Sequence, residues 1–288
     1  MAVAQCPASC GELIQGWILD SEKLISCPID WYSTVEVRSG APLADERPLS
    51  RAMINQVLAL FHYPVKMSQS LRLEIHSTIP IAKGMASSTA DIAATAVATA
   101  HHLGHTLDEA TLAKLCVALE PTDSTIFRQL TLFDHNDAST QEACAAQPKI
   151  DVLVLESPET LRTEDYHRTP RRAGLLAGAP MLQQAWEKVR LACASQDPIL
   201  LGEATTLSAI ASQPLLPKPH FSTLLDVAEA CDLYGINVAH SGSVVGLLLD
   251  RRMHDVEQVR WLLGKKHLTA HWPEQHLLTM VEGGVTLL

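Results

Sequence analysis

A glycine, two adjacent serines and the start of an alanine-rich segment follow one another within residues 80–90, and this combination can hold a phosphate group. A glycine such as Gly84 lets the backbone approach a ligand closely, because it carries no side chain. The hydroxyls of Ser87 and Ser88 can donate hydrogen bonds or coordinate a magnesium ion. The segment therefore predicts a phosphate-binding loop. Its residues are Pro80, Ile81, Ala82, Lys83, Gly84, Met85, Ala86, Ser87, Ser88, Thr89 and Ala90.

This loop is expected to join a strand to a helix. Residues 71–76 alternate between apolar and polar, which is typical of a strand, and residues 91–100 are rich in alanine, the best helix former. Ser88 and Asp91 have the spacing of a capping box, which predicts that the helix begins at the two serines. The N-terminus of a helix carries unpaired N–H groups and a partial positive charge, which attract anions. A capped turn without a ligand is the alternative, and the chain has no Gly-Lys-Ser/Thr tripeptide of a Walker A loop.

Carboxylates that could orient or deprotonate a hydroxyl occur in residues 120–124, whose sequence is Glu-Pro-Thr-Asp-Ser. This segment follows a predicted helix over residues 107–119 and precedes a predicted strand and turn over residues 126–133. Asp123 comes shortly after Pro121, whose restricted backbone favours a tight turn that would hold the carboxylate rigidly. An aspartate that only forms the turn is the structural alternative.

The remainder of the chain is expected to supply the helices and strands that position these segments. The polar residues 141–147 mark a boundary, so we expect one domain over residues 1–147 and a second over residues 148–288. A Ser-Gly-Ser turn precedes an apolar run that is typical of a buried strand. The other predicted strands cover residues 31–37, 149–155 and 244–249, and the other predicted helices cover 51–61, 179–194, 199–212 and 223–234.

Composition and charge limit the classes of function. The chain has 288 residues, of which 47% are hydrophobic and 19% charged, as in a folded protein with an ample core. Its net charge of −10 argues against nucleic acid or an anionic membrane surface as a partner. The chain lacks a basic, apolar leader and a run of 18 apolar residues, so we expect no membrane segment and a cytoplasmic location. The seven widely spaced cysteines are expected to be reduced rather than to form disulfides or a zinc site.

The pattern Pro-x-x-x-Gly-x-x-Ser-Ser-x-Ala in residues 80–90 resembles the second motif of the GHMP family of small-molecule kinases, whose loop wraps the phosphates of ATP. Met85 and Ala86 stand where the family usually has leucine and glycine, so this loop must accept a methyl group at position 86. The resemblance implies an α+β, two-domain GHMP kinase fold. In that fold the N-terminal domain is like domain 2 of ribosomal protein S5 and the C-terminal domain is ferredoxin-like. The resemblance also implies ATP and Mg²⁺ as cofactors.

Two other motifs of the family have weaker counterparts in this chain. Residues 6–16 resemble a shortened first motif, which lines the acceptor pocket, and imply substrate contacts by Ser9 and Glu12. Ser9 stands where several members carry a lysine or arginine that helps to lower the pKa of the acceptor hydroxyl. The turn before residues 244–249 resembles the third motif, which packs against the phosphate loop. The ATP-binding residues that it implies are Ser241, Gly242 and Ser243.

The acidic segment 120–124 resembles a Pro-Ser-Gly-x-Asp segment of the family. This similarity implies that Asp123 is the catalytic base or an electrostatic stabiliser of the reaction. Ser88 and Glu120 are the magnesium ligands that we expect. An acidic protein must gather positive charge around ATP locally, and Lys83 is expected to provide it together with the helix N-terminus and the metal ion.

Within the family, residues 7–16 and 120–124 are most similar to members that phosphorylate free L-threonine. Those members make O-phospho-L-threonine, a precursor of the aminopropanol linker of cobalamin. Asp30 is the expected acceptor for the ammonium group of such a small-molecule substrate. Three alternatives stay open: a kinase of homoserine or another small alcohol, a decarboxylase of the same fold, and a sensor that binds ATP or a metabolite without catalysis. The sequence leaves the oligomeric state open.

Overall fold

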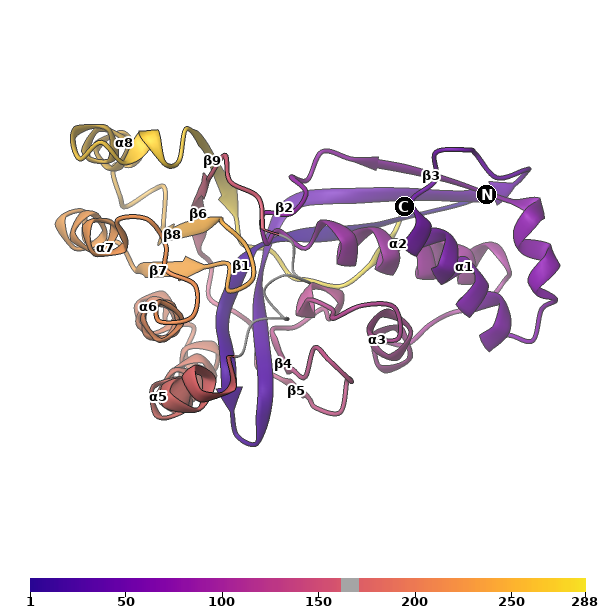
Figure 1. Ribbon diagram of the computed structural model, residues 1–288, viewed down its shortest axis with the longest axis horizontal. Helices are drawn as coiled ribbons and strands as arrows, with labels where there is room; N and C mark the ends of the chain where they lie inside the picture. Colours follow the sequence, from indigo (N-terminus) through magenta and orange to yellow (C-terminus); the bar gives the residue numbers. More distant parts are fainter. Residues whose placement is uncertain (162–170) are drawn as a thin grey trace.

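The computed structural model describes residues 1–161 and 171–288 of the chain, and its strands form one ten-stranded sheet (Figure 1). The strand order is β5-β4-β2-β1-β7-β8-β6-β9, with β3 paired to β2 and β10 paired to β1, and these strands pair antiparallel. The strands are β1 (Ala2–Ile18), β2 (Ser21–Ser39), β3 (Leu71–Ser77), β4 (Thr131–Phe133), β5 (Gln141–Ala143), β6 (Asp151–Glu156), β7 (Gly235–Val238), β8 (Val245–Leu249), β9 (Glu274–Thr279) and β10 (Thr286–Leu287).

The helices lie on both halves of this sheet. In Figure 1 the helices α1 to α3 accompany one end of the long strands, and α5 to α8 gather around the other end. The α-helices are α1 (Pro48–Leu60), α2 (Ser87–His102), α3 (Glu109–Val117), α5 (Arg172–Ser195), α6 (Pro198–Ser212), α7 (Phe221–Ala230) and α8 (Val256–Lys265). The short 3-10 helices are η1 (Val65–Ser70), η2 (Ser124–Ile126) and η3 (Leu268–Ala270).

A long hairpin of β1 and β2 runs through the middle of the molecule (Figure 1). Its strands are joined by the two residues Leu19 and Asp20, and its register shifts on both sides of Glu12. Helix α2 packs across this hairpin, and twelve of its residues are buried. Its many alanines and small polar residues allow this close approach. The sequence predicted a strand only over residues 31–37 here, so the hairpin is longer than expected.

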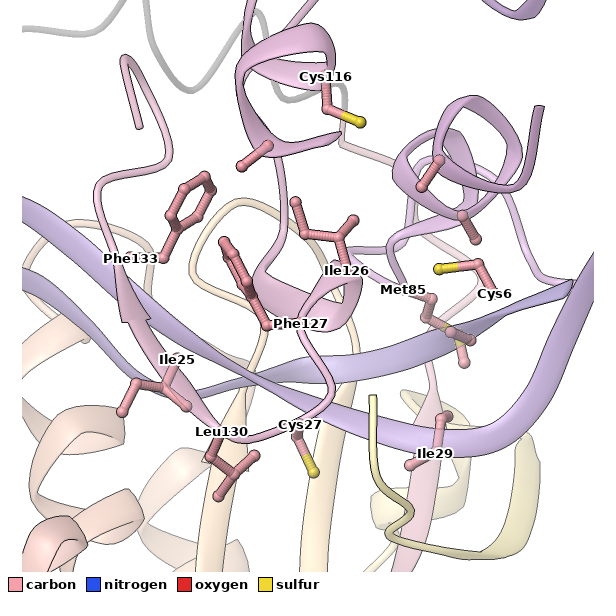
Figure 2. Close-up of a cluster of buried hydrophobic side chains, with 14 of the residues drawn as sticks. Cys6, Ile25, Cys27, Ile29, Met85, Cys116, Ile126, Phe127, Leu130 and Phe133 are labelled. Carbon is pink, nitrogen blue, oxygen red and sulfur yellow. The ribbon is translucent and has the colours of Figure 1, made fainter. Parts of the chain in front are cut away.

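A cluster of buried side chains joins the hairpin to the helices that follow it. Figure 2 shows the part of this core around η2, where Met85 from the predicted phosphate loop lies among side chains of the hairpin and of residues 116–133. Phe127 and Phe133 meet edge to face at 5.0 Å. All seven cysteines are free, and six of them are buried, as in their expected use as small apolar side chains. Because Met85 is packed in this core, it anchors the predicted phosphate loop there.

The same core continues into the C-terminal half of the chain. Helices α5 and α6 pack against β1, and the apolar cluster that contains Ile14 also contains Leu182 and Trp186. A second cluster lies between β6 to β9 and the helices α7 and α8. The boundary between residues 1–147 and 148–288 stays a prediction, and β1 contacts elements on both sides of it.

Most predicted elements occur in the structure, with differences at their ends. The strand over residues 71–76 and the helix over residues 91–100 are confirmed as β3 and α2. The strand expected over residues 126–133 is shorter, because residues before it form η2 and only β4 pairs with the sheet. The helix expected over residues 223–234 ends at Ala230, before a chain reversal that leads into β7. Within the described ranges, no helix has the length and apolar character to cross a membrane.

Candidate active site

A cavity of about 360 Å³ lies where the start of α2, the middle of the hairpin and residues 119–123 come together. It contains almost all of the predicted phosphate loop and all of the predicted acidic segment except Ser124. The described residues that line it are Glu12, Gln15, Leu24, Pro80, Ile81, Ala82, Gly84, Met85, Ala86, Ser87, Ser88, Thr89, Leu119, Glu120, Pro121, Thr122, Asp123, His135 and Ser241.

The N-terminus of α2 opens on this cavity without a side-chain cap. The helix begins at Ser87, as the sequence predicted, and the residue before it is Ala86, which has the left-handed φ of 57° and no polar side chain. The capping box between Ser88 and Asp91 is wrong, because the Asp91 carboxylate bonds to Ser33 and Arg47 instead. Ser88 is exposed and lines the cavity. The first N–H groups of the helix are therefore available to an anionic ligand.

The third-motif turn holds the phosphate loop by direct backbone contact. The backbone N–H groups of Ser243 and Val244 donate to the carbonyl of Lys83 at 3.0 and 3.1 Å. A Cβ on Gly84, which has a φ of 79°, would lie 2.4 Å from the Cβ of Ala239, and a Cβ on Gly242 would lie 2.3 Å from the Lys83 carbonyl oxygen. Both positions therefore require glycine. The expected packing of these two motifs occurs, although only Ser241 of the turn lines the cavity.

The first-motif segment supports the same loop from the other side. The backbone N–H groups of Ser9 and Gly11 donate to the carbonyls of Met85 and Gly84, each at 3.1 Å. The Ser9 hydroxyl is buried and bonds to the backbone of Cys27, from whose N–H it accepts at 2.9 Å. The structure therefore gives Ser9 a role in ordering the hairpin and the loop, and it places the Ser9 side chain outside the cavity lining rather than at a substrate contact.

The charge of Lys83 does not reach the cavity. Its ammonium group is buried and donates to the carbonyls of Ser157 and Glu159, the latter at 2.9 Å. The Lys83 ammonium group therefore links the loop to the chain after β6 and does not line the cavity. The expectation that Lys83 supplies positive charge to ATP is corrected by this geometry, because both carbonyl partners hold the ammonium group outside the cavity lining.

Asp123 lies beside the first turn of α2 and is hydrogen-bonded to it. Its Oδ2 accepts a hydrogen bond from the Thr89 hydroxyl at 3.1 Å, and its backbone N–H donates to the same hydroxyl at 3.2 Å. Burial raises the pKa of the Asp123 carboxyl to about 7, and the negative charges of Glu12 and Glu120 add to this effect. Hydrogen bonds from Thr89 and Ser26 oppose the rise in this pKa. A carboxyl that titrates near neutrality in a cavity is suited to proton transfer.

Glu12 lines the cavity from the bulged middle of β1. Its side chain is only 2% exposed, and Oε2 accepts hydrogen bonds from the backbone N–H of His240 at 2.8 Å and from Nδ1 of His240 at 3.1 Å. Asp30 is not brought into this group. It is exposed, accepts from the backbone N–H of Thr279 at 2.7 Å, and does not line the cavity, so its expected role as the ammonium acceptor is not supported.

The cavity is rich in acidic and hydroxyl oxygen atoms. Glu12, Glu120 and Asp123 all line it, and no lysine or arginine of the described ranges does. Ser88 and Glu120 both present oxygen ligands, which suit a hard cation such as magnesium. Within the described ranges, no cluster of three acidic, histidine or cysteine side chains forms a metal site on its own. This donor set fits Mg²⁺, which is commonly held by one or two carboxylates together with phosphate oxygens.

Several cavity residues carry no signal in the sequence. Gln15 lies in the predicted first-motif segment, and its position there was the only available indication. The others are brought in by β2, by the end of α3 and by the chain after β4, so their proximity follows from the tertiary fold. The lining residues that sequence reasoning missed are Gln15, Leu24, Leu119, Pro121, Thr122 and His135.

Comparison with known proteins places this chain in a family. The family profile described as "GHMP kinases N terminal domain" matches residues 51–127. The chain is 72% identical over 287 residues to an L-threonine kinase of Citrobacter freundii, with 100% of both proteins covered. The chain therefore belongs to the GHMP kinase family. It is also 68% identical to an L-threonine kinase of Salmonella typhimurium, over 100% of this chain and 96% of that protein.

The fold is shared with solved structures of very different sequence. The structure of mevalonate diphosphate decarboxylase from Staphylococcus aureus matches 100% of this chain and 97% of its own chain, with a TM-score of 0.74 at 14% identity. At this level of identity the similarity shows the fold alone. The predicted membership of the GHMP kinases and the predicted fold are confirmed by these findings.

Proposed function

We propose that this protein transfers the γ-phosphoryl group of ATP to the side-chain hydroxyl of L-threonine and forms O-phospho-L-threonine and ADP. Membership of the family and the two highly identical relatives support an ATP-dependent kinase. The observation that carries the proposal is the position of Asp123. Its carboxyl, with a pKa of about 7, is bonded to Thr89 in the first turn of α2, and both residues line the cavity at the uncapped start of that helix.

The proposed chemistry uses groups that line the same cavity. The loop of residues 80–90 and the first N–H groups of α2 hold the phosphates of ATP, with Ser241 beside them. Asp123 orients the threonine hydroxyl and accepts its proton as the new O–P bond forms. The bond between the γ-phosphorus and the bridging oxygen breaks, ADP leaves, and Asp123 returns its proton to the solvent. Most of the rate in such a transfer comes from positioning and from stabilisation of charge.

Ser88 and Glu120 are the residues that we propose to hold magnesium. When bound, the ion neutralises charge on the phosphate oxygens. The oxygen-rich lining supports this assignment, and the carboxylates would otherwise repel a polyphosphate, because no lysine or arginine of the described ranges lines the cavity. Lys218 lies behind the third-motif turn, where its ammonium group donates to the Gly242 carbonyl at 2.6 Å. Burial lowers the pKa of Lys218 to about 8.

The two relatives favour threonine over homoserine as the acceptor, because both are L-threonine kinases that align with all of this chain. Glu12 is proposed to contact the acceptor. The same resemblance supports a place in the synthesis of the aminopropanol linker of cobalamin. A cytoplasmic location and the lack of a nucleic-acid partner are proposed from the net charge of −10 and from the chemistry of a free amino acid.

The decisive test is a turnover assay of the purified protein with ATP and Mg²⁺ against L-threonine, L-homoserine, L-serine, mevalonate and common sugars. We expect ADP to form fastest with L-threonine. Phosphothreonine and phosphohomoserine have the same mass, so the product must be separated by chromatography against both standards. A higher kcat/KM with homoserine would overturn the threonine assignment and leave a kinase. ATP binding without turnover of any acceptor would overturn the kinase proposal and favour a sensor.

A further inference from the structure

Gln15 is a cavity residue whose side chain carries a buried acceptor without a hydrogen-bond partner among the described residues. The residue is only 5% exposed and lines the cavity. Its Oε1 is buried and has no hydrogen-bond partner among the described residues. A buried polar atom without a partner destabilises the folded protein, so its presence in a binding cavity indicates that a ligand satisfies it.

The backbone of β1 brings Gln15 and Glu12 to the same cavity. In a regular strand, residues three apart point to opposite faces of the sheet. The pairing of β1 with β2 shifts its register between Ser9 and Glu12 and again between Glu12 and Ile14. Such a bulge re-aims the side chains that follow it, which allows both Glu12 and Gln15 to line the cavity.

Contacts with the C-terminal half of the chain fix both residues. The backbone N–H of Gln15 donates to the Ser208 hydroxyl at 3.0 Å, and that hydroxyl lies 3.1 Å from Nε2 of His240. Nδ1 of His240 in turn lies 3.1 Å from Oε2 of Glu12. Gln15, Ser208, His240 and Glu12 are all buried, so this chain of hydrogen bonds holds the Gln15 backbone and the Glu12 carboxylate in place before a ligand arrives.

We propose that Gln15 determines specificity by accepting a hydrogen bond from the ammonium group of an amino-acid substrate, with Glu12 as the second acceptor. This inference rests on the proposed amino-acid kinase function. An amide oxygen and a carboxylate both require donors, and an ammonium group carries three donors and a positive charge. The described lining of the cavity includes three carboxylates and no lysine or arginine, which favours a cationic group at this position.

The test uses two ligands that divide threonine between them. L-2-Aminobutyrate keeps the ammonium group and lacks the hydroxyl, whereas 3-hydroxybutyrate keeps the hydroxyl and lacks the ammonium group. Their dissociation constants are measured by calorimetry for the wild type and for Gln15→Met, which keeps the length of the side chain and removes the acceptor. Gln183→Met is the matched control, because Gln183 lies on α5 and its side chain bonds, within residues 1–161 and 171–288, to the exposed Glu187.

We expect Gln15→Met to weaken the binding of L-2-aminobutyrate about tenfold or more, which corresponds to about 1.4 kcal/mol. Binding of 3-hydroxybutyrate should change less than about twofold, and the control should change neither constant. Equal weakening of both ligands would show that Gln15 acts only on the fold, and unchanged constants would show that it does not meet the ammonium group. Either result overturns the proposal.

A second variant covers the case in which Gln15→Met does not fold. Gln15→Glu keeps an acceptor, so it should raise the preference for L-2-aminobutyrate over 3-hydroxybutyrate, and a fall in that ratio would overturn the proposal. Turnover of L-threonine by the wild type tests the proposed function separately. Absence of turnover with an intact ligand preference would reject the kinase and keep the ammonium site. Turnover of L-threonine with no effect of either Gln15 variant on ligand binding would keep the kinase and reject the ammonium site.

Discussion

One carboxylate, Asp123, lies beside the start of helix α2 and another, Asp91, lies in its body, but the two are satisfied in different ways. At the start, Thr89 bonds to a carboxyl whose pKa is raised to about 7, and Ser88 is exposed to the cavity. In the body, Asp91 is bonded to Ser33 and paired with Arg47. A carboxylate paired with an arginine and a serine, as at Asp91, stabilises the contact of the helix with the hairpin. A carboxyl beside the cavity whose pKa is raised, as at Asp123, is available for chemistry.

The largest expected effect is at the start of the helix. Asp123→Asn removes the group that accepts the hydroxyl proton, so kcat should fall by roughly 10²–10⁴-fold, while KM for ATP stays within about threefold. The measurement is steady-state kinetics with L-threonine and ATP. In the wild type, kcat/KM for L-threonine should rise with pH through about 7 as Asp123 loses its proton, and the variant should lack this step. Near-normal kcat in the variant would reject Asp123 as the base.

The same variant should be more stable than the wild type at neutral pH. The pKa of Asp123 is higher in the folded protein, at about 7, than its ordinary value of 3.8, so the folded state binds the proton more tightly. The contribution of Asp123 to stability is therefore most favourable below about pH 4 and is lost as the pH rises to 7. We expect Asp123→Asn to gain about 1–2 kcal/mol at pH 8 and nothing at pH 4, as measured by urea unfolding.

Ser88→Ala tests the first turn of α2 itself and should have the next largest effect. Loss of the hydroxyl removes a proposed magnesium or phosphate contact, so turnover should fall about 10²-fold, or about 2.7 kcal/mol in the barrier. The concentration of Mg²⁺ that gives half-maximal rate should rise in parallel. Ser70→Ala, at an exposed position in η1, is the matched control and should behave as the wild type. Unchanged kinetics at limiting Mg²⁺ and ATP would remove Ser88 from the site.

In the body of the helix, Asp91→Asn should reverse the pattern of Asp123→Asn. The change keeps a partner for Ser33 but removes the ion pair with Arg47, which is partly exposed. We expect a loss of about 1–3 kcal/mol in the free energy of unfolding and a kcat within about threefold of the wild type. Urea unfolding and kinetics on the folded protein measure the two effects. A large loss of kcat without loss of stability would erase the proposed distinction between the two carboxylates.

Local sequence was enough to predict the parts of the site that are built from neighbouring residues. The strand β3, the loop of residues 80–90 and the start of α2 depend on short-range periodicity, a glycine and helix-forming alanines, so their order could be read directly. The apolar Met85 is consistent with its buried position in the core. Placing Asp123 in the cavity was a prediction from the resemblance, and the structure brings it to Thr89.

The remaining features depend on partners that lie far away in the sequence. Lys83 looked like a phosphate ligand, but its ammonium group is held by carbonyls at Ser157 and Glu159. The Ser9 hydroxyl accepts a hydrogen bond from the backbone N–H of Cys27, and the Asp30 carboxylate accepts one from the backbone N–H of Thr279. The long hairpin was missed because the middle of both strands is buried on both faces, which removes the apolar and polar alternation that marks a strand.

The smallest expected effect concerns Ala86, whose left-handed φ of 57° explains why the family usually has glycine at the start of this helix. Relief of that strain by Ala86→Gly is worth about 1–2 kcal/mol. Greater freedom of the unfolded chain and loss of a buried methyl group oppose it by about 1–2 kcal/mol together. The free energy of unfolding should therefore change by less than about 0.5 kcal/mol.

The matched substitution in the body of the helix is Ala94→Gly, at a fully buried position. It relieves no strain, so the lower helix propensity of glycine and the lost methyl contacts should together cost about 1–2 kcal/mol. Urea unfolding of the two variants at one pH makes the comparison. Equal destabilisation by both would show that the start of α2 is held no differently from its body. A larger loss in Ala86→Gly would show that the methyl group at the cavity is itself required for the packing of the loop.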